Sequence, residues 1–474
     1  MIATETVRRP EASFRDPSGF VFELGGRIFR AVDASCLEVI RGLADQGLLA
    51  ELIDAGRVVP TRIVEPGADL EALREAAPGA AGYLEHQRID PISYPAEWSP
   101  AMLADAGIAT LELQERLLRH GWSLKDATAY NIQFVRGRPV FIDLASIERI
   151  ARPDVWPALG QFNRMFTLPL LLQRLRGADL RGIFLSHLDG LDPEEARGAF
   201  SPLGLMRPGL LADLTLPWLL GRLARRDPAT TSTSRPACAA GPAVQLANLR
   251  RLRRKLRALA DGSRRSTWSD YADTCSYSDR AEESKMLSIR DFLDQHRPPS
   301  VLDVGCNTGR YALLAADSGA RVVAIDRDAA SVDLLYRRVR AAGADVLPLC
   351  VDLANPTPAI GFRNRERPAF LERVRADCVL ALAVIHHLHV SANLPLDRIR
   401  DLLADLAGRH LVLEFVPTDD GMFRRLTRFR ADLYGDFTLQ RCIASFSRRF
   451  ELLLRRPVAD SPRTLLFWKK RSSA

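Results

Sequence analysis

The chain has 474 residues, a formal net charge of +8 and 47% hydrophobic residues, which fits two or three domains of an ordinary globular protein. No stretch approaches the roughly 18 to 20 apolar residues of a membrane span, so we expect no membrane partner. The N-terminus is charged and has no apolar core, so we do not expect it to be a secretory signal. Seven cysteines without a C-x-x-C pair favour reduced thiols, so we expect a cytoplasmic protein without a metal site.

The N-terminal part begins with a predicted β-hairpin. Residues 19–30 alternate apolar and polar side chains on both sides of a Gly25-Gly26 turn. Apolar residues then recur at helical spacing over 100–120, which predicts an amphipathic helix. Together these patterns indicate an α+β domain.

Residues 124–143 resemble the catalytic core of kinase-like phosphotransferases, which reads D-x-x-x-x-N followed by a hairpin and a second Asp. Asp126, Asn131 and Asp143 occupy those positions. However, residues 1–124 contain no Lys to bind nucleotide phosphates, and Arg is not a free substitute. We therefore favour a kinase-derived domain without phosphotransfer over an active kinase; coincidental loop chemistry is a third possibility.

A Pro- and Thr/Ser-rich segment over 226–242 reads as a linker, and leucines at helical spacing over 243–264 predict a connecting helix. The arginines of this helix predict a solvated basic face. The chain has only five lysines, and its heavy Arg use looks like genomic base-composition bias. Since no aromatic residues interleave the basic run, it is a poor match for a nucleic-acid surface, and we do not expect a nucleic-acid partner.

The run over 301–310 predicts a strand, a glycine turn and a helix, and a second strand over 321–326 ends in a carboxylate. A dinucleotide fingerprint reads G-x-G-x-x-G, which lets a pyrophosphate reach the helix N-terminus. Here the pattern is D-x-G-x-N-x-G, and Asp303 would repel a pyrophosphate but suit a cationic amino-acid ligand. The pattern resembles the S-adenosylmethionine (SAM) site of class I methyltransferases.

This resemblance implies a Rossmann-like, seven-stranded α/β domain. Further strands are predicted over 344–352, 377–383 and 410–416, and a closing antiparallel hairpin over 450–454 and 464–468. In the family, the glycine turn approaches the cofactor closely. By this resemblance Asp303 faces the ammonium group, Asp326 accepts hydrogen bonds from the ribose hydroxyls, and Asp352 lies near the adenine. The cofactor-binding residues so assigned are Asp303, Gly305, Asn307, Gly309, Asp326 and Asp352.

Three residues are candidate catalytic bases. His386 and His387 follow the fourth strand at the end where acceptors enter this fold, and imidazole titrates near neutrality. Either ring could instead cap a helix or pack. Glu414, at the tip of the fifth strand, is a further candidate, with a structural carboxylate as the alternative. The long connection over 353–376 reads as a wall of the acceptor pocket or a domain contact, and Trp268, Tyr271 and Tyr277 as a lid over SAM or as core residues.

As a whole, the chain resembles a bacterial family of two-part methyltransferases that includes the NoeA-like nodulation proteins. The resemblance rests on the runs YPAEW (94–98), LKDATAYNIQF (124–134), PVFID (139–143), NPTPAIGF (355–362), LAVIHHL (382–388) and EFVP (414–417).

The resemblance implies a SAM-dependent methyltransferase but does not identify its acceptor. Our leading hypothesis is a small-molecule acceptor, a specialised metabolite or glycan, with transfer to oxygen favoured. The alternatives are an RNA or protein methyltransferase that docks through an Arg-rich N-terminal half, a bifunctional kinase and methyltransferase, and a non-catalytic SAM-fold scaffold. The expected domains are 1–225, a linker over 226–242, a helix over 243–264 and a methyltransferase domain over 265–474.

Overall fold

The computed structural model describes residues 7–9, 13–152, 154–216, 218–219, 241–261, 278–428 and 434–471. The chain forms two compact units. Unit 1 comprises residues 1–134, 139–263 and 360–367, and unit 2 comprises residues 135–138, 264–359 and 368–474. Trp268, Tyr271 and Tyr277 lie outside the described residues, as does most of the expected linker. Within the described residues, no helix is long and apolar enough to cross a membrane.

Unit 1 contains a four-stranded antiparallel sheet in the order β1-β2-β4-β3. The hairpin turn at Gly25 and Gly26 has φ angles of 57° and 72°, which a glycine adopts without steric cost. Buried Phe22 and Phe29 form part of the core on this sheet. The strands are β1 (Gly19–Leu24), β2 (Arg27–Val32), β3 (Thr61–Ile63) and β4 (Gly82–His86), with α1 (Ala34–Asp45), α2 (Leu48–Asp54) and α3 (Ala68–Ala76) between them.

The rest of unit 1 is mostly helical, with two short strand pairs, β5–β8 and β6–β7. Ser99 caps α4 by accepting a hydrogen bond from the Met102 amide. The elements are η2 (Pro95–Glu97), α4 (Pro100–Arg119), β5 (Trp122–Leu124), η3 (Ala129–Asn131), β6 (Ile132–Val135), β7 (Arg138–Phe141), η4 (Leu144–Ser146), β8 (Ile147–Arg149), α5 (Leu159–Phe162), η5 (Asn163–Thr167), α6 (Leu168–Arg176), α7 (Leu180–Ser186), α8 (Pro193–Gly198), α9 (Pro202–Leu205), α10 (Pro208–Leu210), η6 (Leu211–Thr215) and α12 (Gly241–Ala260).

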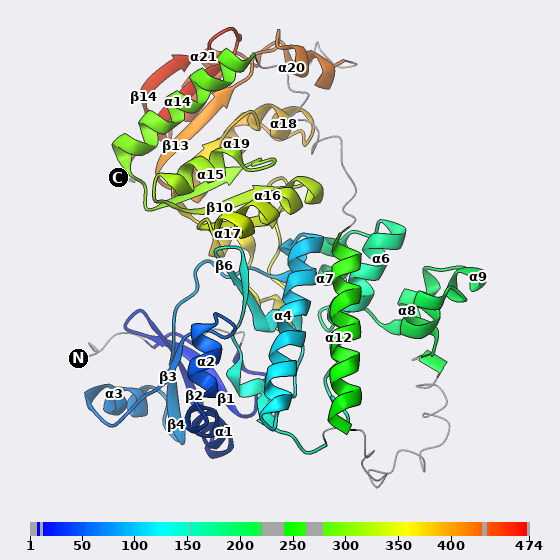
Figure 1. Ribbon diagram of the computed structural model, residues 1–474. Helices are drawn as coiled ribbons and strands as arrows, with labels where there is room; N and C mark the ends of the chain where they lie inside the picture. The colour runs from blue at the N-terminus through cyan, green and yellow to red at the C-terminus, as the bar shows by residue number, and fades with distance from the viewer. Residues whose placement is uncertain are drawn as a thin grey trace. The chain divides into compact units, whose positions relative to one another are not determined.

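The predicted connecting helix is α12, and it is part of unit 1. Its leucine stripe, Leu249, Leu252 and Leu256, is buried, and α12 runs beside α4 (Figure 1). The basic face of α12 is not simply solvated, because Arg253 lies 3.4 Å from Glu115 of α4.

Unit 2 contains a seven-stranded sheet in the order β11-β10-β9-β12-β13-β15-β14. The first five strands in this order are parallel, and β15 runs antiparallel to both β13 and β14. The central strands are buried on both faces and consist of near-continuous apolar runs, as expected for a parallel sheet covered by helices. This topology confirms the predicted Rossmann-like class I fold and the closing hairpin.

The strands of unit 2 are β9 (Ser300–Val304), β10 (Arg321–Asp326), β11 (Val346–Cys350), β12 (Ala376–Ala381), β13 (Ala407–Phe415), β14 (Phe450–Pro457) and β15 (Thr464–Lys470). Its helices are α14 (Asp279–His296), α15 (Arg310–Asp317), α16 (Ala329–Ala342), α17 (Phe370–Arg373), α18 (Ile385–Val390), α19 (Leu396–Leu406), α20 (Gly421–Leu426) and α21 (Leu439–Phe446).

The connection between β11 and β12 contains the segment Ile360–Arg367, which belongs to unit 1. Its short helix η8 spans Phe362–Asn364. Within unit 1, Glu366 accepts two hydrogen bonds from Arg15 at 2.8 and 2.9 Å, and the Arg367 guanidinium lies 3.8 Å from the centre of the Tyr130 ring.

Candidate functional site

The turn between β9 and α15 has the left-handed backbone that its glycines predict. Gly305, Asn307 and Gly309 have φ angles of 70°, 49° and 84°. Asn307 tolerates this conformation better than most residues and fixes it locally, because its side-chain oxygen accepts a hydrogen bond from the Thr308 amide at 2.6 Å. At Gly309, an added Cβ would lie 2.1 Å from Leu335 Cδ1 of α16, so the start of α15 requires glycine.

Asp326, at the tip of β10, ties the two strand ends together. Its carboxylate accepts a hydrogen bond from the Asn307 amide and another from the Asp328 amide, both at 2.9 Å. Burial raises the pKa of Asp326, and these two backbone donors oppose the shift. The side chain therefore already shapes the turn, and its oxygens retain lone pairs for a ligand.

Asp303 lies at the end of β9 and is only 2% exposed. Its Oδ2 atom has no hydrogen-bond partner among the described residues. Burial raises the pKa of Asp303 to about 7; the nearby Lys285 ammonium opposes this shift, and the Asp326 carboxylate adds to it. An unpartnered buried carboxylate oxygen is costly, which makes Asp303 a site for a hydrogen-bond donor or a cation.

Asp352 lies at the adjacent strand end. Asp326 pairs with Cys350 in the sheet register, and Asp352 follows two residues later. The Asp352 carboxylate accepts a hydrogen bond from the Ala354 amide at 2.9 Å. The fold thus brings Asp303, Asp326 and Asp352 to the carboxyl edge of three neighbouring strands, where ligands bind in open α/β sheets.

The two candidate histidines begin α18. Their ring centres are 4.2 Å apart, and the His386 ring lies 6.3 Å from that of Phe423 in α20. His386 is 2% exposed, and its Nδ1 atom has no partner among the described residues. Burial lowers the pKa of His386 far below its usual range and that of His387 to about 4. Both rings are therefore neutral at pH 7, and each is a weaker base than an ordinary histidine.

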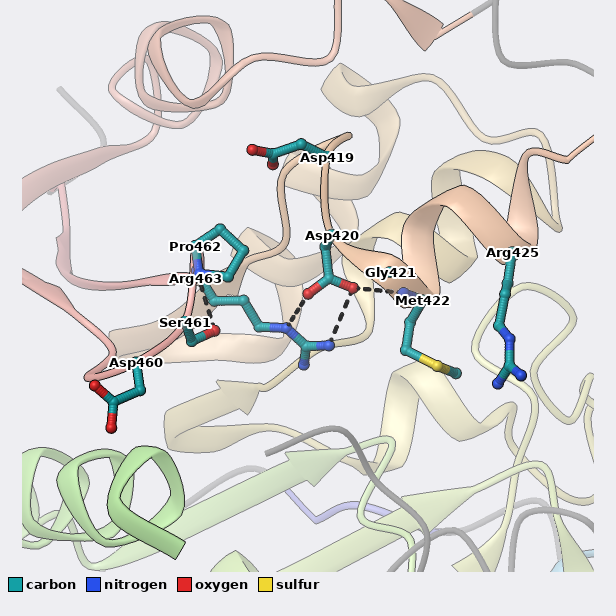
Figure 2. A pocket seen from close by; sticks show the side chains of 9 residues that line it. All are labelled: Asp419, Asp420, Gly421, Met422, Arg425, Asp460, Ser461, Pro462 and Arg463. Atoms are coloured by element: carbon teal, nitrogen blue, oxygen red, sulfur yellow. Dashed lines mark hydrogen bonds and ion pairs between the residues drawn. The ribbon is translucent and has the colours of Figure 1, made fainter. Parts of the chain in front are cut away.

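Glu414 is fully buried and paired with cations. Its Oε2 atom lies 2.5 Å from Lys285 Nζ, and its Oε1 atom lies 3.7 Å from Arg463 Nη1. Arg463 in turn donates two hydrogen bonds to Asp420, at 2.8 and 3.2 Å (Figure 2). The structure therefore surrounds Glu414 with fixed charges.

Lys285, Arg463 and Asp420 were not identified from the sequence. For Lys285 a signal was available, because it occupies the apolar stripe of α14 together with Ala281, Ile289 and Phe292. A lone Lys on the buried face of an amphipathic helix requires an anionic partner.

A pocket with a volume of about 420 Å³ lies beside this cluster (Figure 2). Its walls are the loop that enters α20 and the turn between β14 and β15. Asp420 and Arg463 belong to both the pocket wall and the buried charge cluster. The lining residues are Asp419, Asp420, Gly421, Met422, Arg425, Asp460, Ser461, Pro462 and Arg463.

Asp143, one of the three kinase-like residues of unit 1, is paired with an arginine. Arg30 of β2 is 8% exposed, and its guanidinium lies 2.8 Å from Asp143 Oδ1 and 2.8 Å from Asp16 Oδ2. Burial raises the pKa of Asp143, and Arg30 opposes that shift. Asp126 is close enough to Asp143 to raise its pKa further. Among the described residues, no group of three or more His, Cys, Asp or Glu side chains is arranged to hold a metal ion.

Comparisons with known proteins agree with this architecture. The methyltransferase-domain family matches residues 278–453. Nodulation protein NoeA of Rhizobium meliloti (strain 1021) is 31% identical over 471 residues, which is 98% of this chain and 96% of that protein.

Two solved structures show a weaker similarity. N-methyltransferase NodS from Bradyrhizobium japonicum WM9 is 13% identical, with a TM-score of 0.31 over 41% of this chain and 99% of NodS. The bifunctional kinase-methyltransferase WbdD is 17% identical, with a TM-score of 0.31 over 42% of this chain and 41% of WbdD.

Proposed function

The chain belongs to the two-part family of nodulation protein NoeA, with a methyltransferase domain in its C-terminal half, and on this premise we propose that it transfers a methyl group from SAM to a small-molecule acceptor. The observation that carries the proposal is the arrangement at the end of β9. A left-handed turn opens beside Asp303, whose Oδ2 atom has no hydrogen-bond partner among the described residues, and Asp326 follows at the tip of the adjacent strand.

The residues at this edge fit the chemical groups of SAM. Asp303 would receive the α-ammonium group, because its Oδ2 atom is buried and lacks a protein donor. Asp326 would accept the ribose hydroxyls with its remaining lone pairs, and Asp352 would lie on the adenine side. When bound, SAM supplies an electrophilic methyl group on a sulfonium, and the protein has to align the acceptor with it.

We place the acceptor at the pocket formed by the loop before α20 and the β14–β15 turn, with oxygen as the favoured methylated atom. The Phe423 amide donates to Asp420 in the pocket wall, and the Phe423 ring faces His386, so the pocket and the two histidines share one structural support. His387 or His386 would accept the hydroxyl proton as the methyl group is transferred, because alkylation of the oxygen makes that proton acidic enough for a weak base. Glu414 is the weaker candidate base, because Lys285 and Arg463 already neutralise its charge.

Binding of SAM to the full-length protein tests the cofactor assignment. Calorimetry should show binding by the wild type and a loss of about tenfold or more in Asp326→Ala, since hydrogen bonds to a charged group contribute about 1.5–3 kcal/mol each. Asp317→Ala, an exposed Asp at the end of α15, is the matched control and should bind like the wild type. Equal affinity in all three proteins would contradict the assignment.

The class of acceptor needs a separate experiment. The protein should be incubated with a bacterial extract and SAM carrying a radiolabelled methyl group, and the products separated by size. Label in the small-molecule fraction is expected. Label confined to protein or RNA would refute the proposed acceptor class and support the macromolecular alternative.

A further inference from the structure

Five charged side chains of unit 2 form a buried cluster beside the proposed cofactor site. They come from α14, β9, β13, the loop before α20 and the residue that precedes β15. Each is at most 5% exposed: Lys285 4%, Asp303 2%, Glu414 0%, Asp420 5% and Arg463 3%. Charges this deep are retained only where they are paired, so their arrangement has to be explained by their contacts.

The contacts leave one member of the cluster without a cation of its own. Arg463 donates two hydrogen bonds to Asp420 and lies 3.7 Å from Glu414. Lys285 lies 2.5 Å from the other oxygen of Glu414. The cluster has three carboxylates and two cations, and Asp303 Oδ2 is the oxygen that has no hydrogen-bond partner among the described residues.

Lys285 donates a hydrogen bond to one of two carboxylates that lie at the ends of different strands. Asp303 pairs with Leu380 of β12, and Leu380 pairs with Val412 of β13, so Asp303 and Glu414 end two strands that flank β12. The Lys285 ammonium lies 4.7 Å from the centre of the Tyr311 ring, in the helix that follows the cofactor turn. The Lys285 ammonium group is close enough to lower the pKa of Asp303, while it donates a hydrogen bond to Glu414.

We propose that Lys285, held by Glu414, is a positioning residue that keeps Asp303 ionised and ready to receive the ammonium group of the cofactor. This inference rests on the proposed function. Lys285 and Arg463 are offset by Glu414 and Asp420, so an ionised Asp303 leaves the cluster with one net negative charge, and the nearby Asp326 carboxylate adds to the negative field. This field favours a ligand that places an ammonium group at Asp303 over one without it.

The groups around Asp303 predict a pH dependence. Burial raises the pKa of Asp303 to about 7, Asp326 of β10 adds to the shift, and Lys285 of α14 opposes it. Cys306, in the turn, stays a neutral thiol because burial raises its pKa far above its usual range. His387, whose pKa is about 4, does not titrate near neutrality. Because the ionised carboxylate is the form that binds an ammonium group, affinity should fall as the pH falls through about 7.

The test is calorimetric titration of the full-length protein with S-adenosylhomocysteine, which carries the same ammonium group, over a pH range that brackets the Asp303 pKa of about 7. Every variant is compared with the wild type at the same pH, so titration of the ligand amine, whose pKa is about 8, affects all of them equally. We call the pH at which Asp303 is half ionised in the free protein the midpoint of the pH dependence. Wild-type affinity should fall by up to about tenfold per pH unit below this midpoint, which is the limit for one proton. Lys285→Met should raise the midpoint by about one unit, the lower end of the effect of a nearby opposite charge. Glu414→Gln should lower it, since Lys285 would then act on Asp303 without an offsetting carboxylate.

Three controls complete the design. Lys285→Arg retains the charge and should keep the wild-type midpoint, as should Lys469→Met, the same substitution at an exposed position. The double variant Lys285→Met/Glu414→Gln removes the buried pair together, so it keeps the test valid if Lys285→Met alone fails to fold; its midpoint should also lie above that of the wild type.

Two results would overturn the inference while leaving the proposed function intact. One is that the folded Lys285→Met variant or the folded double variant has the same midpoint as the wild type. The other is that Glu414→Gln raises the midpoint or leaves it unchanged. By contrast, a wild type that binds no S-adenosylhomocysteine at any pH would contradict the proposed function itself.

Discussion

Individual residues at the cofactor edge are constrained in different ways. Gly309 is required by space and backbone angle, and Asn307 by its tolerance of a left-handed conformation. Asp303 is constrained by chemistry, because its buried Oδ2 atom has no hydrogen-bond partner among the described residues. The first two could be inferred from the sequence, since a turn of this kind restricts the residue type directly. The apolar stripe of α14 signals that Lys285 needs an anionic partner, but its effect on Asp303 could not be inferred, because the two residues come close only through the tertiary fold.

The steric requirement at Gly309 gives a stability prediction. Gly309→Ala should lower the free energy of unfolding by about 2–5 kcal/mol, which combines overpacking against Leu335 with the cost of a positive φ. Gly319→Ala, where φ is 90° and nothing lies within 4 Å of the added Cβ, should cost only about 1–2 kcal/mol. Urea unfolding of both variants measures the difference, and equal losses would show that Gly309 is not tightly packed.

The histidine pair predicts how stability depends on pH. The pKa of His387 is lowered from 6.5 to about 4 in the folded protein, so its contribution is fully present above pH 6.5. Unfolding frees the ring to bind a proton, and the contribution is lost as the pH falls from 6.5 towards 4. In urea unfolding at several pH values, His387→Asn should lose less stability over this range than the wild type. Identical pH profiles would contradict the assigned shift.

The arginine in the kinase-like cluster predicts an absence of phosphotransfer. Arg30 lies 2.8 Å from Asp143, the carboxylate to which the resemblance assigns a metal, and a fixed cation there opposes metal binding. Incubation of the full-length protein with radiolabelled ATP and Mg²⁺ should therefore label no acceptor. Phosphorylation that Asp126→Ala abolishes would contradict this prediction and make the protein bifunctional.

Secondary-structure elements were the most predictable level of the molecule. The N-terminal hairpin, α4 and all seven strands of unit 2 follow from apolar periodicity and turn residues, because these signals are local. The placement of α12 in unit 1 and of Ile360–Arg367 in the same unit did not follow, since each depends on a distant partner. For α12 that partner is α4, where Gly107 allows Leu256 to approach closely.

Packing of α12 on α4 can be tested by truncation. Leu256 is fully buried, and Leu256→Ala should lower the free energy of unfolding by about 2–5 kcal/mol. Val244→Ala, at a position of the same helix that is 57% exposed, is the control and should change stability by less than about 0.5 kcal/mol. If Leu256→Ala left the free energy of unfolding unchanged, α12 would be a connecting helix that does not pack on α4.

At the scale of the whole molecule, the described residues with proposed cofactor roles all belong to unit 2, whereas the kinase-like cluster belongs to unit 1. The methyltransferase fold was predictable from the sequence because five parallel strands and a closing hairpin each left a local pattern. The proposed acceptor pocket beside α20 could not be predicted from the sequence, because it is built by a loop and a turn whose side chains form no common motif.

A crystal structure of the full-length protein with S-adenosylhomocysteine is the most direct test of the central claim. We expect the ribose hydroxyls at Asp326, the ammonium group within hydrogen-bond distance of Asp303 Oδ2, and the adenine beside Asp352. A ligand bound elsewhere, or an Asp303 carboxylate that contacts no ligand group or ligand-bound water, would contradict it.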